Sequence, residues 1–435
     1  MSQLMAKIQS REAAIGIIGL GYVGLPLAVE KAKAGFRVAG FDVQPQKVDM
    51  VNAGQNYIGD VVDADLAEVV KSGMLRAMTD FASVATCDCV CIAVPTPLDA
   101  HQQPDISYVR ASAESILPHM HKDMLIVLES TTYPGTTEEL LKPLLDKSGL
   151  QCGVDFYLAF SPERVDPGNK LYNTKNTPKV VGGITPKCTD VAAALYEAVL
   201  DAPVYRVSSP AIAEMEKILE NTYRNVNIGL INELAMLCDR MKINIWEVID
   251  AAKTKPYGFQ AFYPGPGLGG HCIPLDPYYL SWKAREYGFH TSMIESSMMV
   301  NDRMPEYCVQ RAMRLLNDRK KAMNRSRVLV LGVAFKQDVD DYRVSPALRV
   351  IDELRKLGAT VSYHDPYIPE YRQGSEMCKG IPELSAKALQ EADLVMVTTA
   401  HTCVDYAFVA DHAPLIFDTK NAMKDVPKRE NIHLL

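Results

Sequence analysis

Short apolar runs separated by helix-compatible segments fill the first 170 residues of the chain. The runs are IGIIGLGYVG at 15–24, FRVAGFD at 36–42, CVCIAVPTP at 89–97, MLIVLEST at 124–131 and FYLAFSPE at 156–163. Each run is long enough for one buried strand, and strands that alternate with helices predict a parallel sheet covered on both faces. We therefore expect a doubly wound α/β domain at the start of the chain.

A long helical segment follows. Ser209 is a suitable N-cap and Pro210 suits the first helical position, and about thirty residues then keep helical spacing. Lys217, Asn221 and Asn225 recur every four residues, so they share one face of the helix. That face is either a solvated stripe or a polar surface turned toward a cleft. Further helical segments are IWEVIDAAKT, YYLSWKAREYG and the methionine-rich TSMIESSMMVNDRMPEYCVQRAMRLL, whose methionines suit a core or a subunit interface.

The last hundred residues repeat the opening pattern. Their strand-like runs are RVLVLGVAFK at 327–336, ATVSYHDP at 359–366, DLVMVTTAH at 393–401 and PLIFDTKN at 414–421. This second unit has no GxGxxG, and Lys336 lies where a phosphate-binding turn would be. It is either a nucleotide-binding domain that uses lysine charge or a structural duplicate without a ligand.

Together these patterns predict two Rossmann-like domains joined by a central helical domain. A chain of 435 residues has room for two or three domains. The expected boundaries are 1–207, 208–322 and 323–435.

A glycine fingerprint follows the first strand. Gly19, Gly21 and Gly24 form GxGxxG between a strand and a helix, and Asp42 ends the second strand 18 residues after the last glycine. This arrangement is typical of dinucleotide binding, with the pyrophosphate at the helix N-terminus. Asp42 favours NAD over NADP because it would repel a 2′-phosphate, although Lys47 lies five residues later.

Small or polar residues end the later strands of the first domain. In a doubly wound sheet the carboxyl ends of the strands line the ligand crevice. Thr96 and Thr131 are therefore placed to contact the cofactor, and Glu163 to contact the substrate. Each of them could instead simply cap a loop between strand and helix.

The segment FYPGPGLGGHCIPLDP at 262–277 carries four glycines and four prolines, so it must be a loop. Cys272 lies in it and Asp276 follows four residues later. A thiol on a glycine-rich loop can meet a substrate and act as a nucleophile. The alternative is a tight connection that carries an incidental cysteine.

Composition narrows the function classes. The net charge is −7 and no block of lysine and arginine suggests a nucleic-acid or membrane surface, so we expect neither partner. The longest uncharged apolar run, 13–29, is too short to span a bilayer. The ten cysteines contain no CxxC pair, which favours free thiols in the cytoplasm. Cys87, Cys89 and Cys91 alternate, so we expect them on one buried strand face rather than at a metal site.

These motifs together resemble the UDP-glucose/GDP-mannose dehydrogenase family over nearly the whole chain. The matching pieces are GLGYVGLP, VPTP, STTYPGT, SPERVDPGN, the helix with Lys217 and Asn221, GPGLGGHCIPLDP and GVAFKQDVDDYRVSP. The form GGHC, with SPERVDPGN and FYPGPG, is similar to the branch that acts on UDP-N-acetylhexosamines. UDP-glucose enzymes more often carry serine or tyrosine at the position of His271.

The resemblance implies a four-electron oxidation of the sugar C6 alcohol to a carboxylate by two NAD in succession. Cys272 would carry the intermediate as a thiohemiacetal and then as a thioester. Lys217 and Asn221 would stabilise the oxyanion. Asp276 and Thr131 would position water, and Glu163 would assist proton transfer.

The resemblance also assigns binding residues. The domain at 1–207 would bind NAD and the domain at 323–435 the UDP-sugar. The cofactor contacts would be Gly19, Gly21, Tyr22, Val23, Gly24, Asp42, Lys47, Pro95, Thr96, Thr131 and Arg343. The substrate contacts would be Glu163, Arg164, Lys217, Asn221, Tyr263, Gly265, Gly267, Gly269, His271, Phe335, Lys336 and Lys420. At the last position the family often has arginine, and lysine keeps the charge but loses the planar fork.

UDP-N-acetylglucosamine is the expected substrate, and a bacterial surface polysaccharide the expected destination. Rival interpretations are a UDP-glucose or GDP-mannose dehydrogenase, a two-electron dehydrogenase of the hydroxyacid or 6-phosphogluconate kind, and a non-catalytic nucleotide-sugar or NAD sensor. The apolar stripe of the long helix predicts a homodimer or a larger homo-oligomer.

Overall fold

The structure is a computed structural model that describes residues 3–59, 61–166, 168–169, 171–270, 272–427 and 429–435. Its backbone forms two compact units. The first comprises residues 1–220 and 278–289, and the second comprises 221–277 and 290–435. The helices α8 (Pro210–Met241) and α10 (Asp276–Ala284) each contribute residues to both units.

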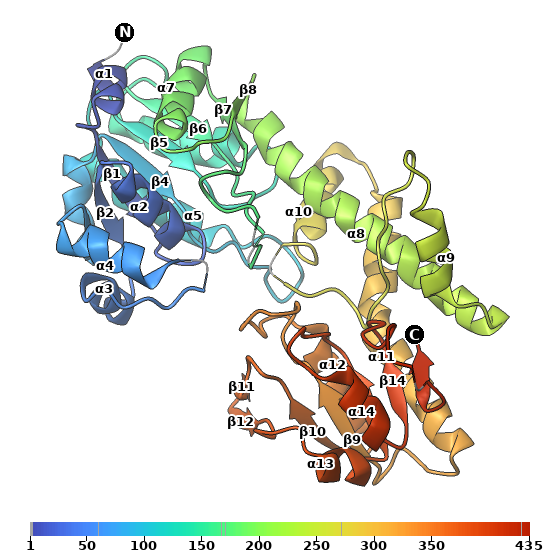
Figure 1. Ribbon diagram of the computed structural model, residues 1–435. Helices are drawn as coiled ribbons and strands as arrows, with labels where there is room; N and C mark the ends of the chain where they lie inside the picture. Colours follow the sequence, from blue (N-terminus) through green and yellow to red (C-terminus); the bar gives the residue numbers. More distant parts are fainter. Residues whose placement is uncertain (1–2, 60, 167, 170, 271, 428) are drawn as a thin grey trace. The chain divides into compact units, whose positions relative to one another are not determined.

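The first unit is built on an eight-stranded sheet in the order β3-β2-β1-β4-β5-β6-β7-β8, with only β6 and β7 pairing antiparallel (Figure 1). The strand order reverses direction between β1 and β4, which is where such sheets bind ligands. The strands are β1 (Ala14–Ile18), β2 (Arg37–Phe41), β3 (Leu75–Met78), β4 (Cys89–Ile92), β5 (Leu125–Leu128), β6 (Tyr157–Phe160), β7 (Lys179–Gly183) and β8 (Val204–Val207).

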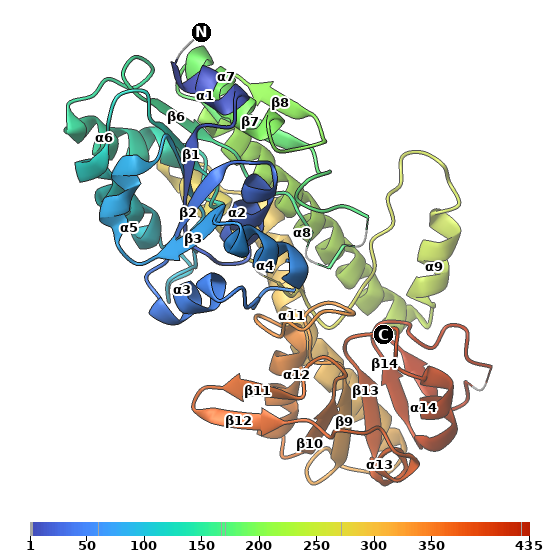
Figure 2. The same cartoon turned by 60° about the vertical axis from the view of Figure 1, so that its left-hand side comes forward.

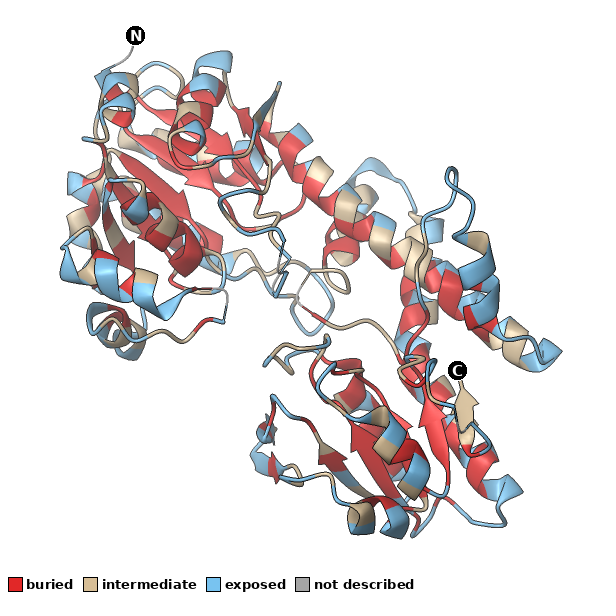
Figure 3. Cartoon of the chain, viewed as in Figure 1, coloured by how far each residue is buried: buried red, intermediate tan, exposed pale blue. Residues whose placement is uncertain are grey.

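Helices cover both faces of this sheet, and the central strands β4, β5 and β6 are buried along their whole length (Figure 3). The helices are α1 (Gln3–Gln9), α2 (Gly24–Lys33), α3 (Pro45–Asn52), α4 (Asp63–Lys71), α5 (Ser107–Ile116), α6 (Lys142–Leu145) and α7 (Pro186–Glu197). Short helical turns are η1 (Phe81–Thr86), η2 (Leu117–His119), η3 (Thr137–Leu141), η4 (Asp146–Ser148) and η5 (Arg285–Tyr287).

The cysteine-rich strand differs from the sequence expectation. Cys89 and Cys91 pack in the core on one face of the sheet, but Cys87 packs with Val90 and Ile92 on the other. The expectation of one shared face is therefore wrong for Cys87. The reason is that β4 begins only at Cys89, while Cys87 caps the end of η1 and does not follow the strand alternation.

The second unit contains a five-stranded parallel sheet in the order β10-β9-β13-β14-β15. Figure 2 shows the β11–β12 hairpin beside β10. The strands are β9 (Arg327–Leu331), β10 (Thr360–His364), β11 (Glu370–Gln373), β12 (Glu376–Lys379), β13 (Leu394–Val397), β14 (Ile416–Asp418) and β15 (Ile432–Leu434). The helices are α9 (Ile245–Ala252), α11 (Ser292–Asp318), α12 (Pro346–Lys356), α13 (Ala386–Glu391) and α14 (Tyr406–His412).

The two sheets repeat the same backbone construction where their first strands end. Gly19 follows β1 with φ +91° and donates its N–H to the carbonyl of Phe41 at 2.8 Å. Gly332 follows β9 with φ +84° and donates to the carbonyl of His364 at 2.9 Å. The predicted α/β class with two Rossmann-like sheets and a helical part around α8 is thus confirmed.

The turn at Gly332 gives a stability prediction. A Cβ on this residue would collide with the carbonyl oxygen of Thr399, and its φ also disfavours alanine. Gly374 has φ +59° but nothing within 4 Å of a Cβ, so it is a matched control. We expect Gly374→Ala to lower the free energy of unfolding by about 1 kcal/mol and Gly332→Ala by about 1–3 kcal/mol more, measured by chemical denaturation. Equal losses would show that the contact with Thr399 is unimportant.

Candidate active site

The glycine fingerprint forms a tight turn after β1, where the strand order of the first sheet reverses direction. A Cβ on Gly19 would collide with the carbonyl oxygen of Ala93, and one on Gly24 with the carbonyl oxygen of Gly19. A Cβ on Gly21 would meet no atom within 4 Å. The turn thus needs glycine for its own packing at two positions and leaves open space at the third. That geometry fits close approach by a pyrophosphate at the start of α2.

Asp42 lies directly after β2 and is held by the same turn. Its carboxylate accepts hydrogen bonds from the N–H groups of Leu20 at 3.0 Å and Gln44 at 2.9 Å. The Lys47 ammonium is 3.8 Å from Asp42 Oδ2, so part of its charge is already matched within the protein. The carboxylate is oriented by two backbone donors, as an acceptor for ribose hydroxyls requires.

The ends of β4 and β5 come together as predicted for parallel neighbours. The hydroxyl of Thr96 donates to the carbonyl of Thr131 at 2.7 Å, and the hydroxyl of Tyr279 donates to the carbonyl of Thr96. Pro95 is exposed. The sequence interpretation passed over Thr132, whose buried Oγ1 has no hydrogen-bond partner among the described residues.

Glu163 is fixed in one orientation beyond the end of β6. Its Oε1 accepts from the N–H groups of Arg164 and Val165, both at 2.9 Å. Its Oε2 lies 3.5 Å from Lys179 Nζ. Lys179 is buried and donates to Glu129 at 2.6 Å. The buried ion pair of Lys179 and Glu129 therefore lies next to Glu163, the carboxylate that the family resemblance assigns to proton transfer.

Glu129 is the centre of this buried cluster. It accepts from the Tyr196 hydroxyl at 2.6 Å and lies 3.8 Å from Lys31 Nζ. Although burial alone favours the neutral acid, Lys179 and Lys31 hold the pKa of Glu129 below its ordinary value. Sequence reasoning missed the cluster because Lys179 begins β7, a strand that the apolar pattern did not predict. The only sequence signal was a glutamate inside an otherwise apolar run.

Arg164 contacts the first turns of α8, and Lys217 belongs to the same part of that helix. The Arg164 guanidinium pairs with Glu220 and lies 3.4 Å from Glu216. It also donates to the carbonyl of Pro178 at 3.0 Å. Burial, followed by the charge of Glu220, raises the pKa of Glu216 to about 7. Lys217 is only 6% exposed, so its face of α8 is turned inward and is not a solvated stripe.

The second unit holds the cysteine loop against α8. Cys272 is half-buried, and its carbonyl accepts from the N–H groups of Leu275 at 3.1 Å and Asp276 at 2.9 Å. Asp276 begins α10 and is buried. The Asn221 amide donates to Asp276 Oδ2 at 2.6 Å and accepts from Arg224 at 2.5 Å. The thiol therefore sits on a turn whose far end is fixed by a buried hydrogen bond.

Further asparagines extend this attachment. Asn225 donates to the carbonyl of Ile273 at 3.0 Å, and Asn232 accepts from the N–H of Gly265 at 3.0 Å. Asn301 of α11 accepts from Asn232 at 2.9 Å. We call Asn221, Asn225, Asn232 and Asn301 the asparagine seam. The seam pins the loop on both sides of the cysteine, so the polar face predicted on α8 serves the loop.

The loop glycines allow it to approach the second Rossmann-like sheet. A Cβ on Gly269 would lie 2.8 Å from Phe335 Cβ, and one on Gly270 would lie 3.1 Å from the Phe335 ring. A Cβ on Gly265 would lie 3.0 Å from Lys420 Nζ. The structure therefore brings Phe335 and Lys420, which the sequence assigns to the substrate, to the predicted loop.

The remaining predicted residues have varied surroundings. Tyr263 is exposed and stacks on Trp246 with ring centroids 6.0 Å apart. Arg343 forms a two-pronged pair with Asp341 at 2.9 and 2.8 Å. Lys336 is half-buried, Gly267 has φ +129°, and Tyr22 and Val23 lie on the turn before α2, the tyrosine exposed. His271 lies outside the described residues.

The described residues contain no group of three or more histidine, cysteine, aspartate or glutamate side chains that could hold a metal ion. Within the same residues, no helix is both long enough and apolar enough to cross a bilayer.

Three domain models of one protein family match most of the chain. Residues 13–200 match the NAD-binding domain of the UDP-glucose/GDP-mannose dehydrogenase family, 211–303 its central domain and 329–425 its UDP-binding domain. The roles of single residues and the domain boundaries at 207 and 322 stay predictions.

The names of the individual relatives specify different sugar substrates. The chain is 35% identical to UDP-N-acetyl-D-glucosamine 6-dehydrogenase of Pseudomonas aeruginosa, covering 90% of this chain and 91% of the relative. It is 36% identical to NDP-N-acetyl-D-galactosaminuronic acid dehydrogenase of Ralstonia nicotianae, covering 89% and 90%. The solved structure of UDP-D-ManNAc dehydrogenase from Pyrococcus horikoshii superposes with a TM-score of 0.88 at 31% identity, covering 97% and 98%. The chain therefore belongs to the UDP-glucose/GDP-mannose dehydrogenase family, whose members are NAD-dependent nucleotide-sugar dehydrogenases.

Proposed function

We propose that this protein oxidises the C6 alcohol of a UDP-N-acetylhexosamine to the uronic acid, for a bacterial surface polysaccharide. UDP-N-acetylglucosamine is our first choice of substrate, and the named Pseudomonas relative acts on that sugar. The observation that carries the proposal is the half-buried Cys272 on a loop pinned by the asparagine seam. The ten free cysteines of the chain are compatible with a reducing compartment, so we also propose a cytoplasmic location.

The proposed reaction removes four electrons from the C6 carbon. NAD, when bound, would accept one hydride in each of two oxidation steps. After the first step, the Cys272 thiolate adds to the C6 aldehyde and forms a carbon–sulfur bond. The second oxidation leaves a thioester, and water then cleaves the carbon–sulfur bond to release the carboxylate and the thiol. A dehydrogenase that stops at the aldehyde or ketone has no need of this cysteine.

The surroundings of the cysteine suit this chemistry. Asp276 is oriented by Asn221, so it can hold the hydrolytic water. The Asn221 amide has two N–H donors, of which Asp276 uses one, and it is itself fixed by Arg224. We assign Asn221, with Lys217 one turn earlier on α8, to the oxyanion at C6. Glu163, held by two backbone donors, assists proton transfer.

The uridine diphosphate half of the substrate is assigned to the second unit. Phe335 lies against the glycines of the cysteine loop, and Lys336 follows it. Lys420 lies at the other end of the loop, beside Gly265. The phosphates would be neutralised by lysine charge, and the loop backbone would lie along the sugar.

Two rivals remain distinguishable. A two-electron dehydrogenase would form one NADH per substrate. A non-catalytic sensor would bind the nucleotide sugar and NAD without turnover. The cysteine loop with its dedicated asparagine contacts favours the four-electron enzyme over both.

The first prediction concerns Cys272. Wild-type protein should form two NADH for each UDP-N-acetylglucosamine consumed. Cys272→Ser should lower kcat on the order of 10³-fold or more while the unfolding midpoint stays unchanged, because a serine alkoxide forms far less readily than a thiolate. Absorbance at 340 nm and quantification of the uronic acid measure both quantities.

Cys403→Ser is the control, because it removes an exposed thiol from the same unit. A panel of UDP-linked N-acetylhexosamines, UDP-glucose and GDP-mannose fixes the substrate. Near-normal NADH formation by Cys272→Ser would exclude the thioester route.

The second prediction concerns the cofactor. Gly21→Ala should fold normally, because its Cβ meets no protein atom within 4 Å. The new methyl group would stand where the pyrophosphate approaches, so KM for NAD should rise about tenfold or more while KM for the nucleotide sugar stays constant. Wild-type kcat/KM should be higher with NAD than with NADP, because Asp42 would repel a 2′-phosphate. An unchanged KM for NAD in Gly21→Ala would place the cofactor elsewhere.

We also propose that two copies of the chain associate through α8. The outward face of this helix carries exposed apolar side chains at Ile212, Met215, Leu219, Tyr223, Leu230, Leu234, Leu237 and Met241. Ile212, Tyr223 and Leu234 are spaced by 11 residues, as are Leu219, Leu230 and Met241. Such a repeat keeps one stripe straight along a helix of about 48 Å, which suits pairing with an identical helix.

The proposed association through α8 can be tested by measuring the molar mass of the protein in solution. Leu230→Glu should convert the oligomer into a monomer in size-exclusion chromatography with light scattering, because a charge would be buried without a partner. Leu171→Glu places the same charge on an exposed leucine that is not part of α8 and should leave the mass unchanged. A wild-type protein that runs as a monomer at micromolar concentration would contradict the proposal.

A further inference from the structure

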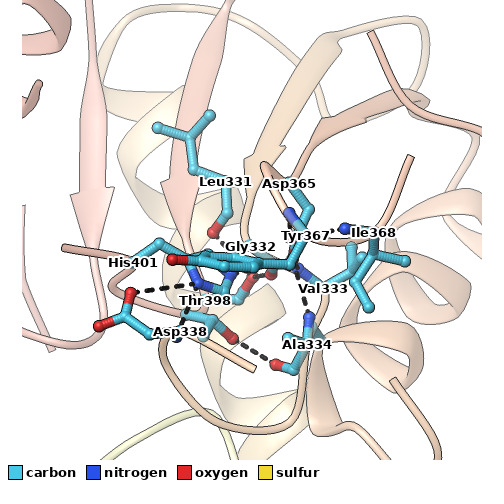
Figure 4. A network of polar contacts seen from close by, with 12 residues as sticks. Leu331, Gly332, Val333, Ala334, Asp338, Asp365, Tyr367, Ile368, Thr398 and His401 are labelled. Atoms are coloured by element: carbon cyan, nitrogen blue, oxygen red, sulfur yellow. Dashed lines mark hydrogen bonds and ion pairs between the residues drawn. The ribbon is translucent and has the colours of Figure 1, made fainter. Parts of the chain in front are cut away.

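A buried histidine lies beneath the turn that follows β9 (Figure 4). His401 is 1% exposed and Asp365 is 5% exposed. The His401 ring lies between the two carboxyl-bearing residues Asp365 and Asp338, with the Tyr367 ring 5.0 Å away. Asp365 follows β10 and is the counterpart of Asp42, which follows β2 in the first unit.

Asp42 and Asp365 differ in the number of backbone N–H groups that they bind in the turn of their unit. Asp42 accepts one N–H from the glycine turn of its unit, that of Leu20. Asp365 Oδ2 accepts two, from Val333 at 2.7 Å and Ala334 at 2.9 Å. The same oxygen also lies 3.0 Å from His401 Nε2. Its other oxygen accepts from the N–H groups of Tyr367 and Ile368. Five donors therefore share a carboxylate that has about four lone-pair sites.

Side-chain hydroxyls also donate hydrogen bonds to the carbonyl groups of the turn that follows β9. The Thr398 hydroxyl donates to the carbonyl of Gly332, and the Thr399 hydroxyl donates to the carbonyl of Ala334 at 2.6 Å. In the first unit the corresponding turn leaves open space at Gly21. In the second unit, therefore, the carbonyls of the turn are bound by threonine hydroxyls, and the N–H groups of Val333 and Ala334, which a pyrophosphate could otherwise accept from, are taken up by Asp365.

His401 extends this bracing to the loop beyond the turn. Its Nδ1 accepts from the N–H of Asp338 at 3.0 Å, so the ring proton must be on Nε2, where it is donated to Asp365. Asp338 has φ +58°, which disfavours a side-chain-bearing residue. Its carboxylate accepts from the N–H of Thr402 at 2.8 Å and from the Thr402 hydroxyl at 2.9 Å. Residues 332–338 are thus held at both ends.

We propose that His401 is a positioning residue for a nucleoside diphosphate site formed by Phe335 and Lys336. By bridging Asp365 and Asp338, it fixes the loop from which these two side chains project. Because Asp365 already takes up the N–H groups of Val333 and Ala334, the second unit selects its ligand through a lysine and an aromatic ring. This inference rests on the proposed nucleotide-sugar function.

A pair of isosteric variants separates the two hydrogen bonds of His401. In His401→Asn, the side-chain oxygen can stand at the Nδ1 position and accept from Asp338. In His401→Gln, the side-chain amide can stand at the Nε2 position and donate to Asp365, but the loop contact is lost. Titration calorimetry with UDP should therefore show about tenfold weaker binding for His401→Gln, the size of one buried hydrogen bond, and a smaller loss for His401→Asn.

NAD binding should remain unchanged in both variants. His364→Gln is the matched control, because His364 lies next to Asp365 but contacts the carbonyl of Ile381. Thr402→Val removes one hydrogen bond to Asp338 at an exposed position, where a substitution disturbs no core packing, and it should weaken UDP binding about threefold.

The outcomes are distinct. UDP binding within twofold of wild type in His401→Gln and Thr402→Val would overturn the positioning role. Equal losses of UDP and NAD binding would also overturn it, because they indicate general damage. If the wild-type protein binds NAD but not UDP, the nucleotide-sugar function itself fails. If His401→Gln does not fold, UDP binding by Thr402→Val alone tests the positioning role.

Discussion

The hydrogen bonds of the asparagine seam are the constraint on which the candidate active site depends. A loop with four glycines and four prolines cannot hold its shape by secondary structure. Asn225 and Asn232 fix its backbone, and Asn221 fixes the buried Asp276 after it. An unmatched buried amide would be costly, so these contacts stabilise one conformation of the loop. Glycine supplies close approach, and the seam supplies rigidity.

The seam explains why α8 has an unusual distribution of side chains. Its inward face mixes polar residues with buried apolar ones such as Ile218 and Ile231. Asn221 there is fully buried, while Leu219 on the outward face is 59% exposed. An ordinary surface helix has the opposite arrangement. Because part of the inward face serves the loop, a second set of apolar residues on α8, Leu219 and Leu230 among them, is exposed on the outward face, and the proposed association rests on this exposure.

Periodicity and short motifs predicted the parts of the structure that local sequence determines. The strands around Gly19 and Gly332, the long helix and the cysteine loop follow from apolar runs, glycine spacing and prolines. The weak strands β3, β7, β8 and β15 were missed, because their residues are partly polar or small and the sheet supplies their partners. The Glu129 cluster and the His401 bridge join residues from distant strands, so no spacing in the sequence could reveal them.

The two Rossmann-like sheets show how one backbone design can serve different ligands. Both place a positive-φ glycine after the first strand and an aspartate after the second. In the first unit the turn keeps open space at Gly21, which suits a ligand with its own phosphates. In the second unit Asp365 takes up the N–H groups of Val333 and Ala334 in the corresponding turn, and His401 in turn holds Asp365. Under the proposed positioning role of His401, recognition there passes to the side chains that the braced loop presents. On that proposal, the loss of the glycine fingerprint changes the mode of binding in a domain that matches the family's UDP-binding domain.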